Sequence, residues 1–439
     1  MGEKNTRFKR VEYSWVIIAV SFLMVMVCLG LCSSGRTLYL TAITDALGFS
    51  RGTYALTDTV RFVTTTILNL YFGKLVKQFG TKKLICAGFS CLICFAIISS
   101  FATNIFAFYG ASILLGIGLS WTSTTMVSTI INKWCTKNKG TITGATLAAN
   151  GIGGAIAIQI LSPLIFEEDN KFGYQTSYRV VAVVLAITLL IVIVLYRENP
   201  IGNKDTNIVV NTNKHKVRGT GWVGMEYTQT VKKPYFYMTI LCMFLTGMAL
   251  QGLGGIAVPH MYDIGFDVEY VAFLASLGGV LLTVAKIING FTYDRFGMRI
   301  SMNICLVSSL ISIFALIILT NTPIGRVIGF IRYVLSSFAL PLETVMLPLF
   351  ASELFGDKSF YRCIGIFSAA STTGFAIGSP FGNVLFDIFG SYNIAFFVLG
   401  AMMVIVTILM QIVLTNANRD KKEILELQET SKLEIAQSI

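Results

Sequence analysis

Long apolar runs alternate with short polar segments along the whole chain, and each run is long enough to cross a lipid bilayer as a helix. Such a helix needs about 20 mostly apolar residues. We expect twelve of them, near residues 14–42, 53–77, 83–102, 104–132, 139–165, 178–196, 235–262, 269–293, 299–320, 323–352, 361–388 and 391–416. The pattern therefore predicts an all-α membrane protein with twelve transmembrane helices.

A longer polar stretch after the sixth run divides these helices into two groups of six. We expect a polar N-terminus, a first bundle, a linker, a second bundle and a tail, at residues 1–13, 14–196, 197–233, 234–416 and 417–439. Lys and Arg gather in the N-terminus, in the loops after spans 2 and 4 and in the linker, whereas the loops between spans 5 and 6 and between spans 7 and 8 are acidic. Because positive loops stay on the cytoplasmic side, both termini are predicted to be cytoplasmic.

The composition agrees with a membrane protein. Only 13% of the residues are charged, and 54% are hydrophobic. A soluble domain would carry about 25% charged residues. The net charge of +11 lies mainly in loops on one side, so it indicates membrane topology rather than nucleic-acid binding.

One short basic loop occurs in both halves of the chain. It runs from Gly73 to Lys83 in the first half and from Gly290 to Arg299 in the second, in each case between two apolar spans. A loop repeated at the same place indicates two copies of one membrane unit. That architecture is typical of secondary transporters, in which two repeats move about a central site.

The sequence lacks the usual signs of enzyme chemistry. We find no nucleotide-binding loop, no hydrolytic triad and no paired catalytic carboxylates, and Cys91 and Cys94 have metal-site spacing without a second pair or a nearby His. We therefore expect no enzymatic activity, no cofactor, no bound metal and no ATP-driven pumping.

The repeated loop and the six-plus-six layout resemble the major facilitator superfamily. The second copy, Gly290-Phe291-Thr292-Tyr293-Asp294-Arg295-Phe296-Gly297-Met298-Arg299, keeps the Gly-x-x-x-Asp-Arg-x-Gly-x-Arg pattern of that family. The first copy has Lys77 where the family usually has Asp. The resemblance implies that this loop holds an inner gate, with Asp294 and Arg295 as its better candidates here.

Further motifs resemble the branch that contains monocarboxylate transporters and oxalate/formate antiporters. They are Glu12-Tyr13-Ser14-Trp15, the segment Trp134–Gly140 followed by Gly144 and Gly151, and Glu353-Leu354-Phe355-Gly356 followed by Gly374, Gly378 and Gly390-Ser391-Tyr392. The resemblance implies transport of small organic anions such as lactate, pyruvate, formate or oxalate.

Six ionisable residues fall inside the apolar runs: Arg36, Asp58, Arg61, Lys286, Arg332 and Glu343. Such residues are costly in a membrane and usually face a cavity or a partner. Three of the cations lie near mid-span, and a path lined by fixed cations favours an anionic substrate. The charged residues therefore predict an anion pathway independently of the resemblance.

Lys286 and Arg36 are the main substrate-binding candidates. Lys286 lies at the position where the resembled branch carries its carboxylate-binding Arg, and Arg36 lies near a substrate-linked Lys of that branch. Alternatively, either side chain snorkels toward a membrane surface. We add Tyr39 and Thr373 as polar residues lining the same path.

The remaining ionisable residues are candidates for coupling or gating. Asp58 and Arg61 are three residues apart on one helix face and are expected to form an ion pair or to take part in gating. Glu343, between Pro341 and Pro348 in a broken helix, either binds a proton or neutralises a buried cation. Arg332 completes this group.

Two departures from the branch bear on the mechanism. Leu282 stands where the resembled proton-coupled carriers have an Asp, which favours exchange over that route of proton coupling, and Thr372 and Thr373 stand where the oxalate antiporter has a second cation. We therefore expect a monomeric plasma-membrane carrier of small organic anions that works by exchange or proton symport. A multidrug exporter of the same fold and a non-transporting solute sensor remain the alternatives.

Overall fold

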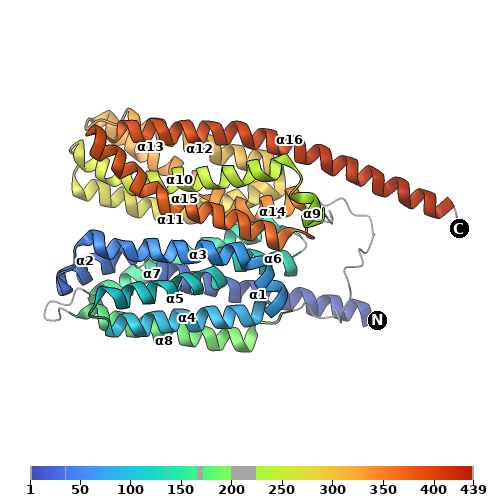
Figure 1. Cartoon of the computed structure of the whole chain (residues 1–439), viewed down its shortest axis with the longest axis horizontal. Helices are drawn as coiled ribbons and strands as arrows, with labels where there is room; N and C mark the ends of the chain where they lie inside the picture. The colour runs from blue at the N-terminus through green and yellow to red at the C-terminus, as the bar shows by residue number, and fades with distance from the viewer. Residues whose placement is uncertain (1, 35, 136, 166–171, 199–223, 438–439) are drawn as a thin grey trace.

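The computed structural model describes residues 2–34, 36–135, 137–165, 172–198 and 224–437. Within these ranges, the side chains of residues 2–12, 36–38, 41, 51–52, 268, 425 and 427–437 are outside the description. The described part is helical, and its helices form two halves that lie side by side in Figure 1.

The first half holds the helices that precede the linker. They are α1 (Gly2–Leu29), the π-helical turn η1 (Gly30–Ser34), α2 (Arg36–Leu47), α3 (Arg51–Phe79), α4 (Thr81–Phe101), α5 (Ile105–Thr122), α6 (Thr124–Trp134), α7 (Lys139–Ile165) and α8 (Gly173–Leu195).

The second half holds the helices that follow the linker. They are α9 (Tyr227–Thr230), α10 (Pro234–Asp263), α11 (Val268–Phe296), α12 (Met298–Ile317), α13 (Pro323–Ala339), the π-helical turn η2 (Leu342–Met346), α14 (Leu347–Phe355), α15 (Phe360–Phe389) and α16 (Asn393–Gln437). The start of α1 and the end of α16 lie at the same end of the molecule, which we call the terminus end, and α2 lies toward the opposite, far end (Figure 1).

Ten helical segments among the described residues are long and apolar enough to cross a membrane. They correspond to ten of the twelve predicted spans, and the other two are α3 and α15, which have 29 and 30 residues. Both are long enough to span a bilayer, and they pack against each other between the halves.

Two of the predicted spans are broken where the sequence places polar residues or proline. The first contains η1, just before Arg36, and the tenth contains η2, which begins directly after Pro341. Extra residues in a helical turn re-aim the side chains that follow, and π-helical turns often occur at functional sites. These breaks bring Ser33 and Glu343 toward the space between the halves.

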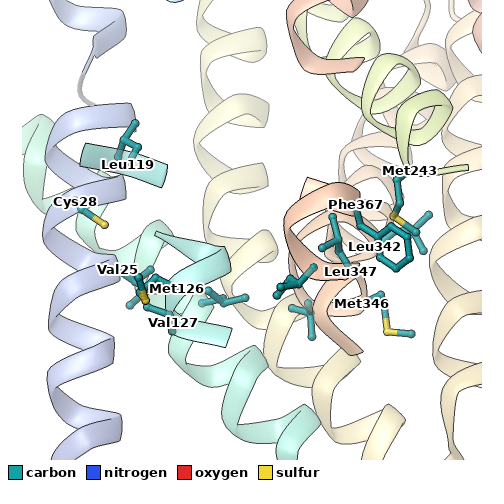
Figure 2. Packing of buried hydrophobic residues seen from close by; sticks show 14 of the residues in the cluster. Val25, Cys28, Leu119, Met126, Val127, Met243, Leu342, Met346, Leu347 and Phe367 are labelled. Atoms are coloured by element: carbon teal, nitrogen blue, oxygen red, sulfur yellow. The ribbon is translucent and has the colours of Figure 1, made fainter. Parts of the chain in front are cut away.

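Each half has its own buried apolar packing near this space. Figure 2 shows Val25, Met126 and Val127 gathered between α1 and α6, and Met243 with Phe367 beside Leu342 and Leu347 in the second half. The side chains that pack here are almost completely buried, and they belong to one cluster that includes residues of both halves.

Glycines allow the two halves to approach closely at the terminus end. A Cβ atom at Gly144 of α7 would lie 2.3 Å from the backbone oxygen of Lys286 in α11, and one at Gly73 of α3 would lie 2.8 Å from the backbone oxygen of Tyr361 in α15. Small residues at such crossings let helix backbones meet in a membrane. Gly144 and Gly73 therefore allow the close approach of helices from the two halves.

Candidate functional site

A cavity of about 340 Å³ lies between the halves and is lined by residues from both. The first half contributes Ser33, Arg61, Asn69 and Asn150, and the second contributes Lys286, Glu343 and Thr372. Apolar side chains such as Leu29, Phe62 and Phe375 complete the walls. The site therefore combines charged and polar groups with enough room for a small solute.

Lys286 projects from α11 into the contact with α7. Its side chain is only 2% exposed, and its Nζ atom donates a hydrogen bond to the backbone oxygen of Leu147 at 3.2 Å. Within the described residues, no carboxylate lies at ion-pair distance from Nζ. A buried ammonium group with one neutral partner is an incompletely compensated charge. An anion entering the cavity would supply the missing partner.

Glu343 faces the same cavity from η2. It is 8% exposed, and its Oε1 atom has no hydrogen-bond partner within the part of the chain that the structure describes. No ion pair joins it to Lys286, although both side chains line one cavity. Lys286 and Glu343 therefore line one cavity without pairing with each other.

Arg61 and Asp58 form the ion pair that their three-residue spacing predicts. Arg61 Nη2 lies 3.1 Å from Asp58 Oδ1, and Arg61 Nη1 donates to Ser33 Oγ at 3.2 Å. The guanidinium group also lies over the ring of Phe62, 4.3 Å from its centre. Arg61 is thus a partly neutralised cation at the cavity wall, and its gating role stays a prediction.

Three of the predicted substrate contacts lie elsewhere or outside the described side chains. Arg36 begins α2, but its side chain is outside the description. Tyr39 is 1% exposed in the first half, where its hydroxyl shares a hydrogen bond of 2.6 Å with Ser177 and its ring stacks on Tyr178. In this conformation Tyr39 is a packing residue, and its predicted substrate contact has no support.

Thr373 also lies off the cavity, one residue away from a side chain that lines it. Its hydroxyl donates to the Ala369 backbone oxygen in its own helix at 2.8 Å. Thr372 lines the cavity instead and shares a hydrogen bond of 2.9 Å with Thr66 of the first half. The predicted neighbourhood is therefore present at the site, but through the adjacent threonine.

Asp294 joins the halves at the terminus end. Its carboxylate accepts hydrogen bonds from the backbone N–H groups of Gly140 at 3.0 Å and Thr141 at 2.7 Å, which belong to the first turn of α7. A carboxylate at a helix N-terminus is stabilised by the free N–H groups and by the helix dipole. Arg295 is exposed and lies over Phe296 of its own helix, so Asp294 makes this inter-half contact without it.

The other hydrogen bonds between the described residues of the two halves also lie from the cavity toward the terminus end. Asn132 donates to Asp357, and Thr125 shares a hydrogen bond with Ser368. The hydrogen bonds that join the described residues of the two halves therefore gather from the cavity toward the terminus end.

Asn150 and Ser120 of the site were missed by the sequence analysis. Asn150 accepts a hydrogen bond from Ser34 at 3.2 Å, and Ser120 donates to Asn69 at 2.9 Å within the cavity wall. The available signal was the occurrence of Ser and Asn inside apolar runs, but many such residues only bond their own helix. Arg332, a further candidate, lines a different cavity inside the second half.

The chain belongs to the major facilitator superfamily, because the family model with that description matches residues 20–355 and 239–437. The structure is also similar to that of the proton:xylose symporter XylE bound to 6-bromo-6-deoxy-D-glucose, with a TM-score of 0.71, 12% sequence identity, and coverage of 92% of this chain and 96% of the other. At that identity, the likeness concerns the fold.

Curated relatives at low identity carry several transporter names. Monocarboxylate transporter 13 of Bos taurus is 24% identical over 74% of this chain and 72% of its own length, and the oxalate:formate antiporter of Oxalobacter formigenes is 20% identical over 95% and 96%. The uncharacterized MFS-type transporter YcxA of Bacillus subtilis is 22% identical over 64% of this chain and 65% of its own length. The multidrug resistance protein MdtG of Proteus mirabilis is 22% identical over 70% and 74%.

Together, the family match and the apolar helices define a multi-pass membrane transporter of the major facilitator superfamily. Transporters of this family bind small-molecule substrates. The substrate of this chain is a separate question, to which the charges of its cavity are relevant.

Proposed function

We propose that the protein is a secondary active carrier of small organic anions that works by alternating access. The observation that carries the proposal is Lys286, a buried cation at the contact between the halves, in a cavity that both halves line. An anionic substrate offsets the cost of burying this charge. A neutral substrate would leave it uncompensated.

Monocarboxylates such as lactate, pyruvate or formate are the favoured substrates. Lys286 offers a point charge rather than the two-pronged donor of an arginine, which suits a single carboxylate with some tolerance of shape. Apolar residues such as Leu29, Phe62 and Phe375 form the other walls and suit the carbon end of the solute. Oxalate requires a second cation, and Arg61 at the opposite wall or Arg36 is the candidate for it.

Alternating access requires that one end of the molecule is closed while the other is open. We propose twelve membrane spans, with α3 and α15 added to the ten apolar segments, and both termini in the cytoplasm. The contacts of Asp294 with Gly140 and Thr141 then close the cytoplasmic side. The carrier would be a monomer of the plasma membrane in an outward-facing state.

The relatives support this proposal without deciding the substrate. A monocarboxylate transporter and an oxalate:formate antiporter by name align with most of this chain. The multidrug resistance relative favours a second candidate, an exporter of the same fold. The buried Lys286 and the paired Arg61 at the cavity favour the anion carrier, because both candidate cations would repel a cationic drug.

Uptake into proteoliposomes tests the proposal. Purified protein is reconstituted, and the uptake of labelled lactate, formate and oxalate is measured with and without unlabelled anion inside and with and without a pH gradient. Uptake only into preloaded vesicles means exchange, and uptake driven by the gradient alone means proton symport. Absence of uptake for all three anions would contradict the proposal and favour the exporter or a solute sensor.

A further inference from the structure

A second cavity of about 300 Å³ lies wholly inside the second half, between α10, α11, α12 and α13. Arg332, Tyr333 and four serines line one part of it, namely Ser309, Ser312, Ser336 and Ser337. This cavity receives no residue from the first half and is therefore distinct from the cavity at Lys286.

Arg332 is the charged group of this second cavity. It is 4% exposed, and its Nε atom has no hydrogen-bond partner among the described residues. Its guanidinium group lies over the ring of Tyr333, 4.5 Å from the ring centre, and no described carboxylate lies at ion-pair distance. A ring offers only partial compensation for a desolvated cation.

A second polar group in the same cavity also lacks a partner. Ser309 is 1% exposed, and its Oγ atom makes no hydrogen bond to the described residues. By contrast, Ser312 donates to the Arg332 backbone oxygen at 3.4 Å and Ser337 to the Gly278 backbone oxygen at 3.2 Å. Because buried polar groups are nearly always satisfied, Arg332 and Ser309 indicate a missing acceptor with a negative charge.

The remaining walls are apolar. Leu253, Ala257 and Val258 of α10 line the cavity together with the polar residues of α12 and α13. A simple inorganic anion would leave this part of the cavity without contacts. A carboxylate with a short hydrocarbon part matches both parts, because its charged end pairs with Arg332 and its carbon end contacts the apolar wall.

The two cavities are neighbours. Leu282 of α11 and Leu340, directly after α13, line both of them. These two leucines therefore form a partition between the Lys286 cavity and the Arg332 cavity. A solute bound at Arg332 lies one side chain away from the cavity between the halves.

We propose that the Arg332 cavity is a second binding site for a monocarboxylate with a short apolar part, separated from the Lys286 cavity by Leu282 and Leu340. The identity of the ligand class rests on the proposed function. The site itself rests on the buried Nε of Arg332 and Oγ of Ser309, which lack hydrogen-bond partners among the described residues, and on the residues that line the cavity. A carrier built in this way holds two anions at once.

Isothermal titration of lactate into the purified, detergent-solubilised protein tests this inference. We expect two lactate sites per chain in the unmodified protein. Arg332→Gln is expected to remove one site and Lys286→Gln the other, so that the double variant binds no lactate. The proposal requires that the two single variants each retain one site.

A glycine substitution gives a control that leaves Arg332 in place. A Cβ atom at Gly279, which lines the second cavity, meets no atom within 4 Å, and the same is true at Gly110 of α5, outside both cavities. Gly279→Leu should therefore fill the Arg332 cavity and remove one lactate site. Gly110→Leu should retain both sites and is the matched control. Together, these two variants test the Arg332 cavity even if Arg332→Gln does not fold.

The outcomes separate this inference from the proposed function. A single lactate site that is lost in Lys286→Gln and kept in Arg332→Gln and Gly279→Leu overturns the inference alone. A single site with the opposite dependence supports lactate binding at Arg332, but it overturns both the role of Lys286 and the claim that two anions bind at once. Two sites unaffected by any of these variants, no lactate binding at all, or a second site that takes chloride but not lactate overturns the inference.

Discussion

The ammonium group of Lys286 in the second half donates a hydrogen bond of 3.2 Å to the backbone oxygen of Leu147 in the first half. This contact joins a buried charged group of α11 to a neutral carbonyl of α7. When the halves separate at the terminus end, the hydrogen bond must break. A carboxylate that binds Lys286 would replace it, which is how substrate binding could favour movement of the halves.

Asp294 provides a testable contact of the closed end. In Asp294→Asn the helix N-terminus of α7 loses a negatively charged acceptor, and such an interaction is worth about 1–2 kcal/mol in a partly buried site. We expect the variant to spend more time open at the terminus end, by about 5- to 30-fold. Spin-label or fluorescence distances between the halves at that end measure this shift.

Arg295→Gln serves as the control, because Arg295 is exposed and lies over its neighbour Phe296. It removes a charge from the same loop without removing the inter-half contact. Equal shifts in the two variants would mean that loop charge, and not the cap on α7, holds the end closed.

Cys135 reports on the same end of the molecule. It lies between α6 and α7, is 6% exposed, and burial raises the pKa of its thiol to about 11. A raised pKa keeps the thiol protonated at neutral pH, and the thiolate is the reactive form. In a protein whose other cysteines are replaced, maleimide labelling should be slow at pH 7 and rise about tenfold per pH unit up to pH 9.

Maleimide labelling of Cys135 in the Asp294→Asn variant tests whether this cysteine reports opening of the terminus end. If the closed halves cover Cys135, the variant labels faster at every pH and its pH dependence shifts toward lower values. A labelling rate at pH 7 that already matches that of a free thiol would contradict the buried position.

Gly144 controls how closely α7 and α11 approach. A Cβ atom there would lie 2.3 Å from the backbone oxygen of Lys286, so Gly144→Ala must push the helices apart. We expect transport to fall at least about tenfold, because closing this end is a required step. Gly110→Ala, whose Cβ meets no atom within 4 Å, should transport normally and excludes a general effect of adding a methyl group.

Glu343 is the candidate for proton coupling. An ionised carboxylate without a partner is costly to bury. We therefore expect the charge of Glu343 to change when a substrate anion enters the cavity. Glu343→Gln should therefore keep anion exchange within about threefold of the unmodified protein and lose any stimulation by a pH gradient. Vesicle uptake with and without the gradient measures both, and stimulation that survives the substitution would assign the proton to another group.

Long elements of the fold could be predicted because hydrophobicity alone determines them. The predicted bounds of the fifth span agree with those of α7, Lys139–Ile165, where a basic segment precedes the apolar run. The breaks near Arg36 and Glu343 could also be predicted, since polar residues and prolines interrupt otherwise continuous runs.

The orientation of single side chains could not be predicted in the same way. A π-helical turn such as η1 shifts the helical phase by one residue, so the face on which Tyr39 lies cannot be read from spacing. An error of one position also explains the choice of Thr373, because its neighbour Thr372 is the residue that lines the cavity. Lys286 and Glu343 were identifiable because a charge inside an apolar run is rare, whereas Asn150 is one of many small polar residues there.

The anion-carrier account is tested most directly by Lys286→Gln in proteoliposomes. Losing a hydrogen bond to a charged group costs about 1.5–3 kcal/mol, so lactate uptake should fall about 10- to 100-fold, with Lys286→Arg partly active. Insertion and folding are checked by equal yields of reconstituted protein. Unchanged uptake of every accepted anion in well-folded Lys286→Gln would contradict the account.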